Sequence, residues 1–286
     1  MTPGDGTRDR TAGELLRDWS RRRRLSQLAL ATEAEVSQRH LSFVECGRAS
    51  PSRAMLLRLA EHLAVPLRER NALLASAGFA PVYRERPLDD VEMAAVRETL
   101  GTLLDAHAPA PALAVDRHWN LLLANDCVAP LIDGVAAHLL EPPLNVLRLS
   151  LHPDGLAPRI ANLGQWRDHL LLRLVRQVER ANDAALGALL DELRDYPAPP
   201  RKRRAEGDGW AGGDIAVPLH LRVAEHSLAL VSTTMVFGTP LDVTLSELAV
   251  ETFFPADRAT AEALRSIRRD AARVSAPRRP PPAAVR

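Results

Sequence analysis

Apolar residues recur at helical spacing through the first 80 residues of the chain. In residues 52–63, for example, Leu56, Leu59, Ala60 and Leu63 stand at positions i, i+3, i+4 and i+7 of one helix face. A hydroxyl residue suited to N-capping precedes each of four such segments, namely Thr11, Ser26, Ser37 and Ser52. The pattern predicts an all-α domain of five short helices over residues 11–80.

Beyond residue 88, short apolar segments of strand-like composition alternate with helical ones. The sequence PALAVDRHWNLLLAN predicts two strands around a turn at Asp116–His118, and residues 215–238 predict a second pair that turns near Ala224–His226. The sequence SELAVETFF fits either a strand or a helix. Because hairpins pair their strands antiparallel, the pattern predicts an α+β domain with a mainly antiparallel sheet over residues 88–268.

Helical segments are expected at four places in this second domain, which are residues 88–107, about 125–140, 162–193 and 256–269. Segments outside the two domains are rich in Pro, Gly and charge. Residues 81–87 are therefore expected to be a linker, residues 1–10 and 269–286 to be disordered, and residues 196–213 to be a mobile loop.

The charge balance differs between the two parts of the chain. The net charge is +1, but the first 80 residues carry 13 arginines against 9 acidic residues, which suggests an anionic partner for them. No apolar run approaches the roughly 18 residues of a membrane span. Two cysteines, Cys46 and Cys127, are too few for a disulfide framework, and the nine histidines lack metal-ligand spacing. We therefore expect a cytoplasmic protein without a metal or cofactor.

Residues 26–45 carry the clearest chemical signal. Two short helices joined by a turn, with three further helices around them, predict a helix-turn-helix module. The second helix of such a pair lies in the DNA major groove, so Gln38 and Arg39 at its start can pair with adenine and guanine. Residues at the starts of the neighbouring helices suit phosphate. The candidate DNA-binding residues are Gln27, Ser37, Gln38, Arg39, His40, Ser42, Arg48, Ser52 and Arg53.

Residues 15–65 resemble the XRE/Cro-type helix-turn-helix family. The sequence LSQLALATEAEVSQRHLSFVECGRASPS follows the family pattern of S-Q, L-A, V-S, E-x-G and P-S. The resemblance implies that Gln27 anchors a phosphate, and that Gln38, Arg39 and His40 face the bases. This chain departs from the pattern at Glu35, where the family usually has glycine in the turn. A left-handed backbone at this residue would cost about 1 kcal/mol.

A longer resemblance covers roughly residues 12–268. The segments RHLSFVECGR, PLRERNALLASAGFAP, VDRHWNLLLAN and GTPLDVTLSELAVETFFPAD are similar to the MmyB-like transcription regulators. The resemblance implies that the C-terminal domain is PAS-like and holds a small, fatty-acid-like molecule.

Apolar segments of the second domain favour a cavity between the sheet and the helix at residues 165–178. The candidate ligand-binding residues are Trp119, Trp166, Arg173 and Phe237. The three aromatic residues among them also suit a filled core, and Arg173 can either hold an anionic head group or pair with an acidic residue. An aromatic content of only 4% favours a slim aliphatic guest over a large planar one.

These observations predict a DNA-binding transcription regulator that binds double-stranded DNA and a small apolar ligand, which the resemblance implies is fatty-acid-like. We expect a homodimer with contacts through residues 88–107. No enzyme is expected, because the sequence holds neither a G-x-S-x-G elbow nor a Gly-rich phosphate loop. One alternative is a second domain that only dimerises. Another is an enzyme with a DNA-binding appendage, which would need His220 or His226 beside an acid and a nucleophile in a cleft.

Overall fold

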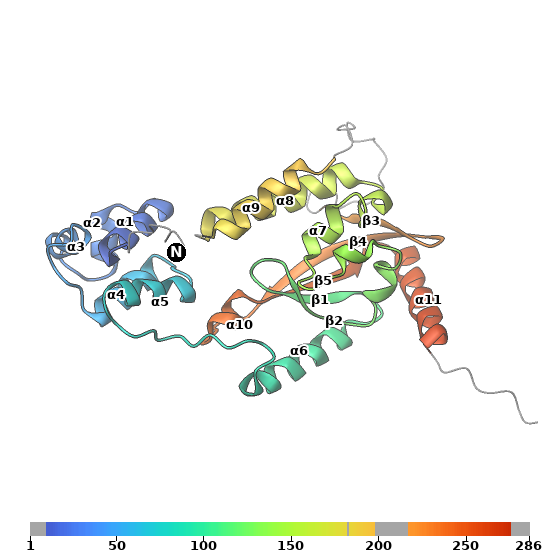
Figure 1. Cartoon of the computed structure of the whole chain (residues 1–286), viewed down its shortest axis with the longest axis horizontal. Helices are drawn as coiled ribbons and strands as arrows, with labels where there is room; N and C mark the ends of the chain where they lie inside the picture. The colour runs from blue at the N-terminus through green and yellow to red at the C-terminus, as the bar shows by residue number, and fades with distance from the viewer. Residues whose placement is uncertain (1–9, 182, 198–216, 276–286) are drawn as a thin grey trace, which may run out of the picture. The chain divides into compact units, whose positions relative to one another are not determined.

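A computed structural model describes residues 10–181, 183–197 and 217–275 (Figure 1). Its contacts divide the chain into two units. The first unit comprises residues up to Pro87 together with two short later segments, one of which is Phe237–Ser246. Two predictions lie wholly or mostly outside the described residues. They are the disorder expected at residues 1–9 and 276–286 and the loop expected at 196–213.

Five helices form the body of the first unit, as predicted. They are α1 (Ala12–Arg23), α2 (Gln27–Glu33), α3 (Gln38–Glu45), α4 (Arg53–His62) and α5 (Leu67–Ser76). Each of the four predicted N-caps accepts a hydrogen bond from a backbone N–H in the first turn of its helix, and Thr11 also forms a capping box with Glu14. The helices share one apolar core, which includes Leu16, Trp19, Leu30, Leu41, Leu56 and Leu73.

The helix-turn-helix pair consists of α2 and α3. The N–H of Val36 donates to the carbonyl oxygen of Ala31 at 2.9 Å and so closes the turn between the two helices. Glu35 within this turn has a φ of 53°, which is left-handed backbone. Helix α3 also lies against α1, so closely that a Cβ at Gly13 would stand 2.4 Å from the carbonyl oxygen of Val44. Glycine at residue 13 therefore sets the distance between these helices.

A five-stranded antiparallel sheet forms the centre of the second unit, as predicted. Its strands are β1 (Ala112–Val115), β2 (Leu121–Ala124), β3 (Leu219–Val223), β4 (His226–Val236) and β5 (Ala249–Pro255), in the order β2-β1-β5-β4-β3. Both predicted hairpins are present, as β1–β2 and β3–β4. The ambiguous segment SELAVETFF begins in a short helix, α10 (Val243–Glu247), and continues as β5.

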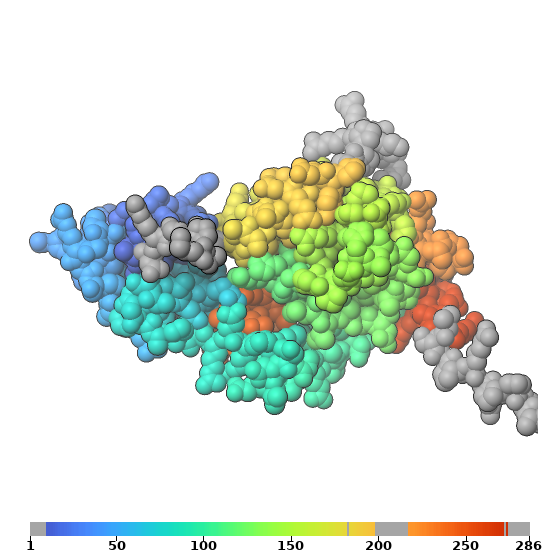
Figure 2. All heavy atoms as spheres, in the orientation of Figure 1, coloured from blue at the N-terminus to red at the C-terminus, as the bar shows by residue number. Residues whose placement is uncertain are grey.

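Further helices cover the sheet and form the surface of the second unit. They are α6 (Ala94–Ala106), α7 (Val146–Leu151), α8 (Leu163–Arg180), α9 (Ala184–Asp195) and α11 (Arg258–Ser275). A 3-10 turn, Val91–Met93, leads into α6 and completes the helix predicted at residues 88–107. Figure 2 shows α9, in gold, at the outer surface of this unit.

Strand alternation gives the sheet two distinct faces. On one face, Ala112, Ala114 and Val250 pack against Leu100 and Leu104 of α6. The residues between them, such as Leu113 and Glu251, point to the opposite face, where they line a cavity together with residues of α7 and α8. Figure 1 shows α7 and α8 against the sheet.

Two predictions for the second domain, one of a helix and one of disorder, need correction. The helix expected at about residues 125–140 is only a pair of 3-10 turns, Ala129–Leu131 and Ala137–Leu139. Pro130 lacks an N–H and Gly134 takes a left-handed φ of 74°, and both features interrupt an α-helix. At the other end of the domain, α11 continues to Ser275, so the disorder expected from residue 269 is wrong for residues 269–275.

Candidate functional site

The start of α3 presents the predicted base-reading residues together. Ser37 is the N-cap, and its hydroxyl oxygen accepts a hydrogen bond from the N–H of His40 at 3.1 Å. The side chains of Gln38, Arg39 and His40 are all exposed, whereas Ser42 is half-buried one turn later. Because Leu41 and Val44 are buried in the core, the polar side chains of α3 occupy its outer face.

Arg39 is partly held in place by its own helix. Its guanidinium lies over the ring of Phe43, 5.4 Å from the ring centroid, which is the i,i+4 spacing of neighbours on a helix surface. This contact restricts the arginine side chain without using its hydrogen-bond donors. A guanidinium held in this way keeps its planar fork for the O6 and N7 acceptors of guanine.

Gln27 has an intramolecular partner that the sequence did not reveal. Its Nε2 donates to Oε2 of Glu45 at 2.9 Å, and Glu45 is 9% exposed. Arg17 of α1 reaches the same residue, because its Nη2 donates to the carbonyl oxygen of Glu45 at 2.6 Å. Glu45 therefore ties the start of α2 and the middle of α1 to the end of α3. One N–H of the Gln27 amide is used in this way, and the amide carries a second that suits a phosphate.

The predicted phosphate-binding residues lie between α3 and α4. Arg48 and Arg53 are exposed, and Arg53 is the first residue of α4. Ser52 caps this helix by accepting a hydrogen bond from the N–H of Met55 at 3.2 Å. The loop is closed at its start by the N–H of Arg48, which donates to the carbonyl oxygen of Phe43 at 2.7 Å. Positive side chains at a capped helix start are suited to an anionic oxygen.

A cavity lies in the second unit between the sheet and the helices α7 and α8. It has a volume of about 110 Å³. Trp119, Trp166 and Arg173 line it, and most of the other lining residues are leucine, valine or isoleucine. Neither His220 nor His226 is among the described residues that line it.

Phe237 differs from the other predicted ligand-binding residues in its exposure and in the unit to which it belongs. It follows the last residue of β4, is 38% exposed and belongs to the segment that groups with the first unit. The cavity lining does not include it among the described residues. A role for Phe237 in ligand binding therefore stays a prediction, without support from the described lining of the cavity.

Both tryptophans present ring surface to the cavity while their N–H groups are hydrogen-bonded. Nε1 of Trp119 donates to Oε1 of Gln177 at 2.8 Å, and Nε1 of Trp166 donates to Oγ of Ser150 at 3.0 Å. Both rings are buried. A buried indole normally finds such a partner, and its satisfied N–H leaves an apolar wall for a guest.

Arg173 is engaged by an acidic residue, which is one of the two roles expected for it from the sequence. Its Nη1 donates to Oε2 of Glu251 at 3.0 Å, and its Nη2 donates to Oε1 of the same carboxylate. Nη2 also donates to the hydroxyl of Thr234 at 2.6 Å. The guanidinium lies over Trp119, 4.5 Å from the ring centroid. Glu251 is only 4% exposed, so the pair places a compensated charge at the cavity wall.

His169 lies beside this pair and stacks on Trp166, with ring centroids 5.5 Å apart. Burial, followed by the nearby charge of Arg173, lowers the pKa of His169. The ring is therefore neutral at physiological pH. The charged groups that act on His169 are Arg173, Glu251 and the exposed Arg176.

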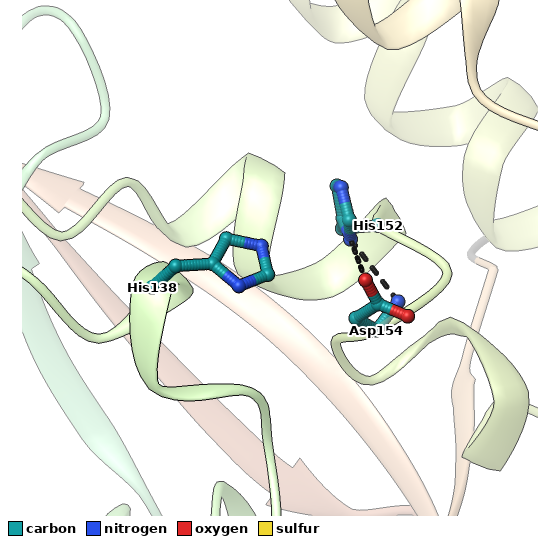
Figure 3. A group of neighbouring side chains, drawn as sticks. All are labelled: His138, His152 and Asp154. Carbon is teal, nitrogen blue, oxygen red and sulfur yellow. Dashed lines mark hydrogen bonds and ion pairs between the residues drawn. The ribbon is translucent and has the colours of Figure 1, made fainter.

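A second polar group, formed by His138, His152 and Asp154, lies near the end of α7 (Figure 3). The N–H of Ala136 donates to the carbonyl oxygen of Asp154 at 3.1 Å, and Nδ1 of His152 accepts the N–H of Asp154 at 3.0 Å. The three ligand atoms lie within 4.8 Å of one another, whereas ligands around tetrahedral zinc stand roughly 3.4 Å apart. Because the turn uses the Nδ1 lone pair of His152, we assign no metal to this group.

Comparison with protein families finds two matches along the chain. Residues 11–73 match the family model of a helix-turn-helix domain, and residues 96–267 match that of the MmyB-like transcription regulator ligand binding domain. Comparison with curated proteins gives no match. Fold and domain content thus define a DNA-binding transcription regulator with a ligand-binding domain. The chain belongs to the MmyB-like transcription regulators, as the sequence resemblance predicted.

Among the described helices, none has the length and apolarity needed to cross a membrane.

Proposed function

We propose that this regulator binds an inverted-repeat DNA site as a homodimer, and that a slim aliphatic molecule in the cavity sets its affinity for that site. The ligand part of this proposal rests on one observation, a cavity lined mostly by aliphatic and aromatic side chains inside the domain that matches the ligand-binding family. Such a surface recognises a hydrocarbon chain and little else.

The DNA part is supported by the start of α3. Gln38 and Arg39 are exposed side by side at a helix N-terminus that Ser37 caps. Gln38 suits the N6 and N7 groups of adenine, and Arg39 suits the O6 and N7 groups of guanine. Arg48, Ser52 and Arg53 supply the phosphate contacts that fix the register of the helix without reading sequence.

An aliphatic guest is supported by the shape of the lining as well as by its chemistry. Leucine, valine and isoleucine from β1–β4, α7 and the 3-10 turn at Ala129–Leu131 surround the space, and two tryptophans flank its polar end. Filling the cavity removes apolar surface from water, which favours binding at roughly 25 cal/mol for each Å² removed. Control of DNA binding then follows from linkage, because a ligand that binds one dimer arrangement better shifts the population toward it.

The test uses the full chain and two measurements. Selection from a pool of randomised duplexes should enrich a two-fold symmetric site, and 1-decanol should then change the Kd for that duplex by about fivefold or more. A pool that shows no enrichment would contradict sequence-specific binding. An operator Kd that stays the same when the cavity is saturated would contradict control by the ligand.

A further inference from the structure

We propose that the cavity selects an aliphatic molecule with an uncharged polar head, such as a primary alcohol or amide, over the carboxylate of the same chain length. The reason is that Glu251 already neutralises Arg173 at the polar end of the cavity. This inference rests on the proposed function, because it names the chemical class of the ligand for the same cavity.

The Arg173–Glu251 pair is complete without a guest. Both oxygens of the carboxylate accept hydrogen bonds from the guanidinium, and Oε1 also accepts the hydroxyl proton of Thr234 at 3.0 Å. Trp119 covers one face of the guanidinium. Glu251 comes from β5 and Arg173 from α8, so the pair also joins the sheet to the helix that closes the cavity.

A guest carboxylate would bring a second anion to this compensated pair. It would have to displace Glu251 from the guanidinium or share it, and a displaced Glu251 would be a buried charge without a partner. Two carboxylates beside one guanidinium also repel each other, so one of them is driven toward its neutral form. His169 does not compensate the second negative charge, because its ring is neutral at physiological pH.

An uncharged head finds hydrogen-bond partners without disturbing the pair. A guanidinium has five N–H donors, and the bonds to Glu251 and Thr234 use three of them, so that Nε–H and one Nη1–H suit the oxygen of a guest. Ser150 accepts a hydrogen bond from Trp166 and still carries a hydroxyl proton that it can donate. Ser232 adds a second hydroxyl to the lining. These groups match an alcohol or an amide.

The test compares two probes of equal chain length, 1-decanol and decanoate, by isothermal titration calorimetry at pH 7.5 with the delipidated full chain. Decanol should bind at least about tenfold more tightly than decanoate. A nearby like charge shifts a carboxyl equilibrium by about one pKa unit or more, and one unit is a tenfold change in an equilibrium constant. The variant Glu251→Gln keeps the shape and removes the negative charge. It should tighten decanoate binding by about tenfold or more and change decanol binding by less than about threefold. The control Glu225→Gln, in the exposed turn between β3 and β4, should change neither.

Two results would overturn the inference and leave the proposed function standing, and a third would overturn both. Decanoate binding as tightly as decanol to the natural chain would overturn it without any variant. A Glu251→Gln protein that folds, as judged by circular dichroism, and keeps the natural preference would overturn it as well. If neither probe binds the natural chain, the proposed ligand control fails at its first step and this inference fails with it.

Discussion

At the scale of single residues, the turn of the helix-turn-helix carries a conformational cost. Glu35 holds a φ of 53°, and a side chain in left-handed backbone costs about 1 kcal/mol relative to glycine. Replacing Glu35 with glycine should therefore raise the free energy of unfolding of the first unit by about 0.5–1 kcal/mol, as measured by urea denaturation. The control is Glu33→Gly in the last turn of α2, where glycine relieves no left-handed residue and should lower the free energy of unfolding by up to about 1 kcal/mol. If Glu35→Gly destabilises the domain, the left-handed turn is not what limits its stability.

Two arginines near α3 should have separable effects on DNA binding. Arg39 is placed to read a base, so Arg39→Ala should cost about 1–3 kcal/mol on the selected duplex and relax the preference at one base pair. Arg53 is placed to bind phosphate, so Arg53→Ala should weaken all duplexes about equally and reduce the salt slope by about one unit. Fluorescence anisotropy at several salt concentrations, on the selected duplex and on single-base variants, measures both quantities.

The two variants act as controls for each other. Unchanged base preference in Arg39→Ala would contradict the assignment of α3 as the reading helix. A loss of base preference in Arg53→Ala would contradict the division between phosphate and base contacts.

Residue pairs distant in sequence show where prediction from the sequence ends. That Arg173 pairs with an acid was foreseen as one of two possibilities, but the identity of Glu251 was not, because the partner stands 78 positions along the chain. The available signal was the single glutamate within the apolar segment LAVETFF, on the same strand face as Phe253. A charge at such a position needs a buried partner. The Gln27–Glu45 contact was missed for the same reason.

At the scale of elements, a single asparagine joins α6 to the first hairpin. Nδ2 of Asn125 donates to the carbonyl oxygens of Leu104 and Ala110 at 3.0 and 2.9 Å, and Oδ1 accepts the N–H of Ala112 at 3.2 Å. Asn125 is 4% exposed. Asn125→Ala should therefore lower the free energy of unfolding of the second unit by about 2–4 kcal/mol, because buried backbone groups lose their partners. Chemical denaturation followed by circular dichroism measures this loss.

The neighbouring residue supplies the control for this prediction. Asp126 is exposed, so Asp126→Ala should change the free energy of unfolding by less than about 0.5 kcal/mol. Equal effects of the two substitutions would contradict the assignment of Asn125 as the connection between α6 and the hairpin.

Elements were predictable where their signals are local. The caps at Thr11, Ser26, Ser37 and Ser52 act within one turn, and a hairpin needs only two apolar segments and a turn, so both could be read from the sequence. The region around residues 125–140 was misread because its apolar residues suit a helix while Pro130 and Gly134 prevent one. The strand order β2-β1-β5-β4-β3 depends on pairings between distant segments, and no local pattern contains it.

At the scale of the whole molecule, the small size of the reading helix argues for pairing. Helix α3 has eight residues, and only its first turn offers exposed base-reading side chains. One such module makes few base contacts, and regulators of this type gain specificity by placing two modules on half-sites about 34 Å apart or a multiple of this distance. We therefore expect a homodimer by sedimentation velocity at working concentration and a footprint over two half-sites. A monomer that protects a single half-site would contradict this prediction.

The segment at residues 88–107 is the expected dimer contact, and its exposed apolar residues make the prediction testable. Val91 is 87% exposed and Leu103 of α6 is 38% exposed, whereas Leu100 and Leu104 face the sheet. A charge at an exposed apolar position of an interface opposes its burial, so Leu103→Glu should weaken the dimer by about tenfold or more without unfolding the domain. The matched control is Leu172→Glu, since Leu172 is 52% exposed on α8.

Because a monomer holds only one reading helix, Leu103→Glu should also lose affinity for the double half-site while keeping its affinity for a single half-site. If Leu172→Glu breaks the dimer and Leu103→Glu does not, the two copies meet through α8 and the control of DNA binding must be sought there.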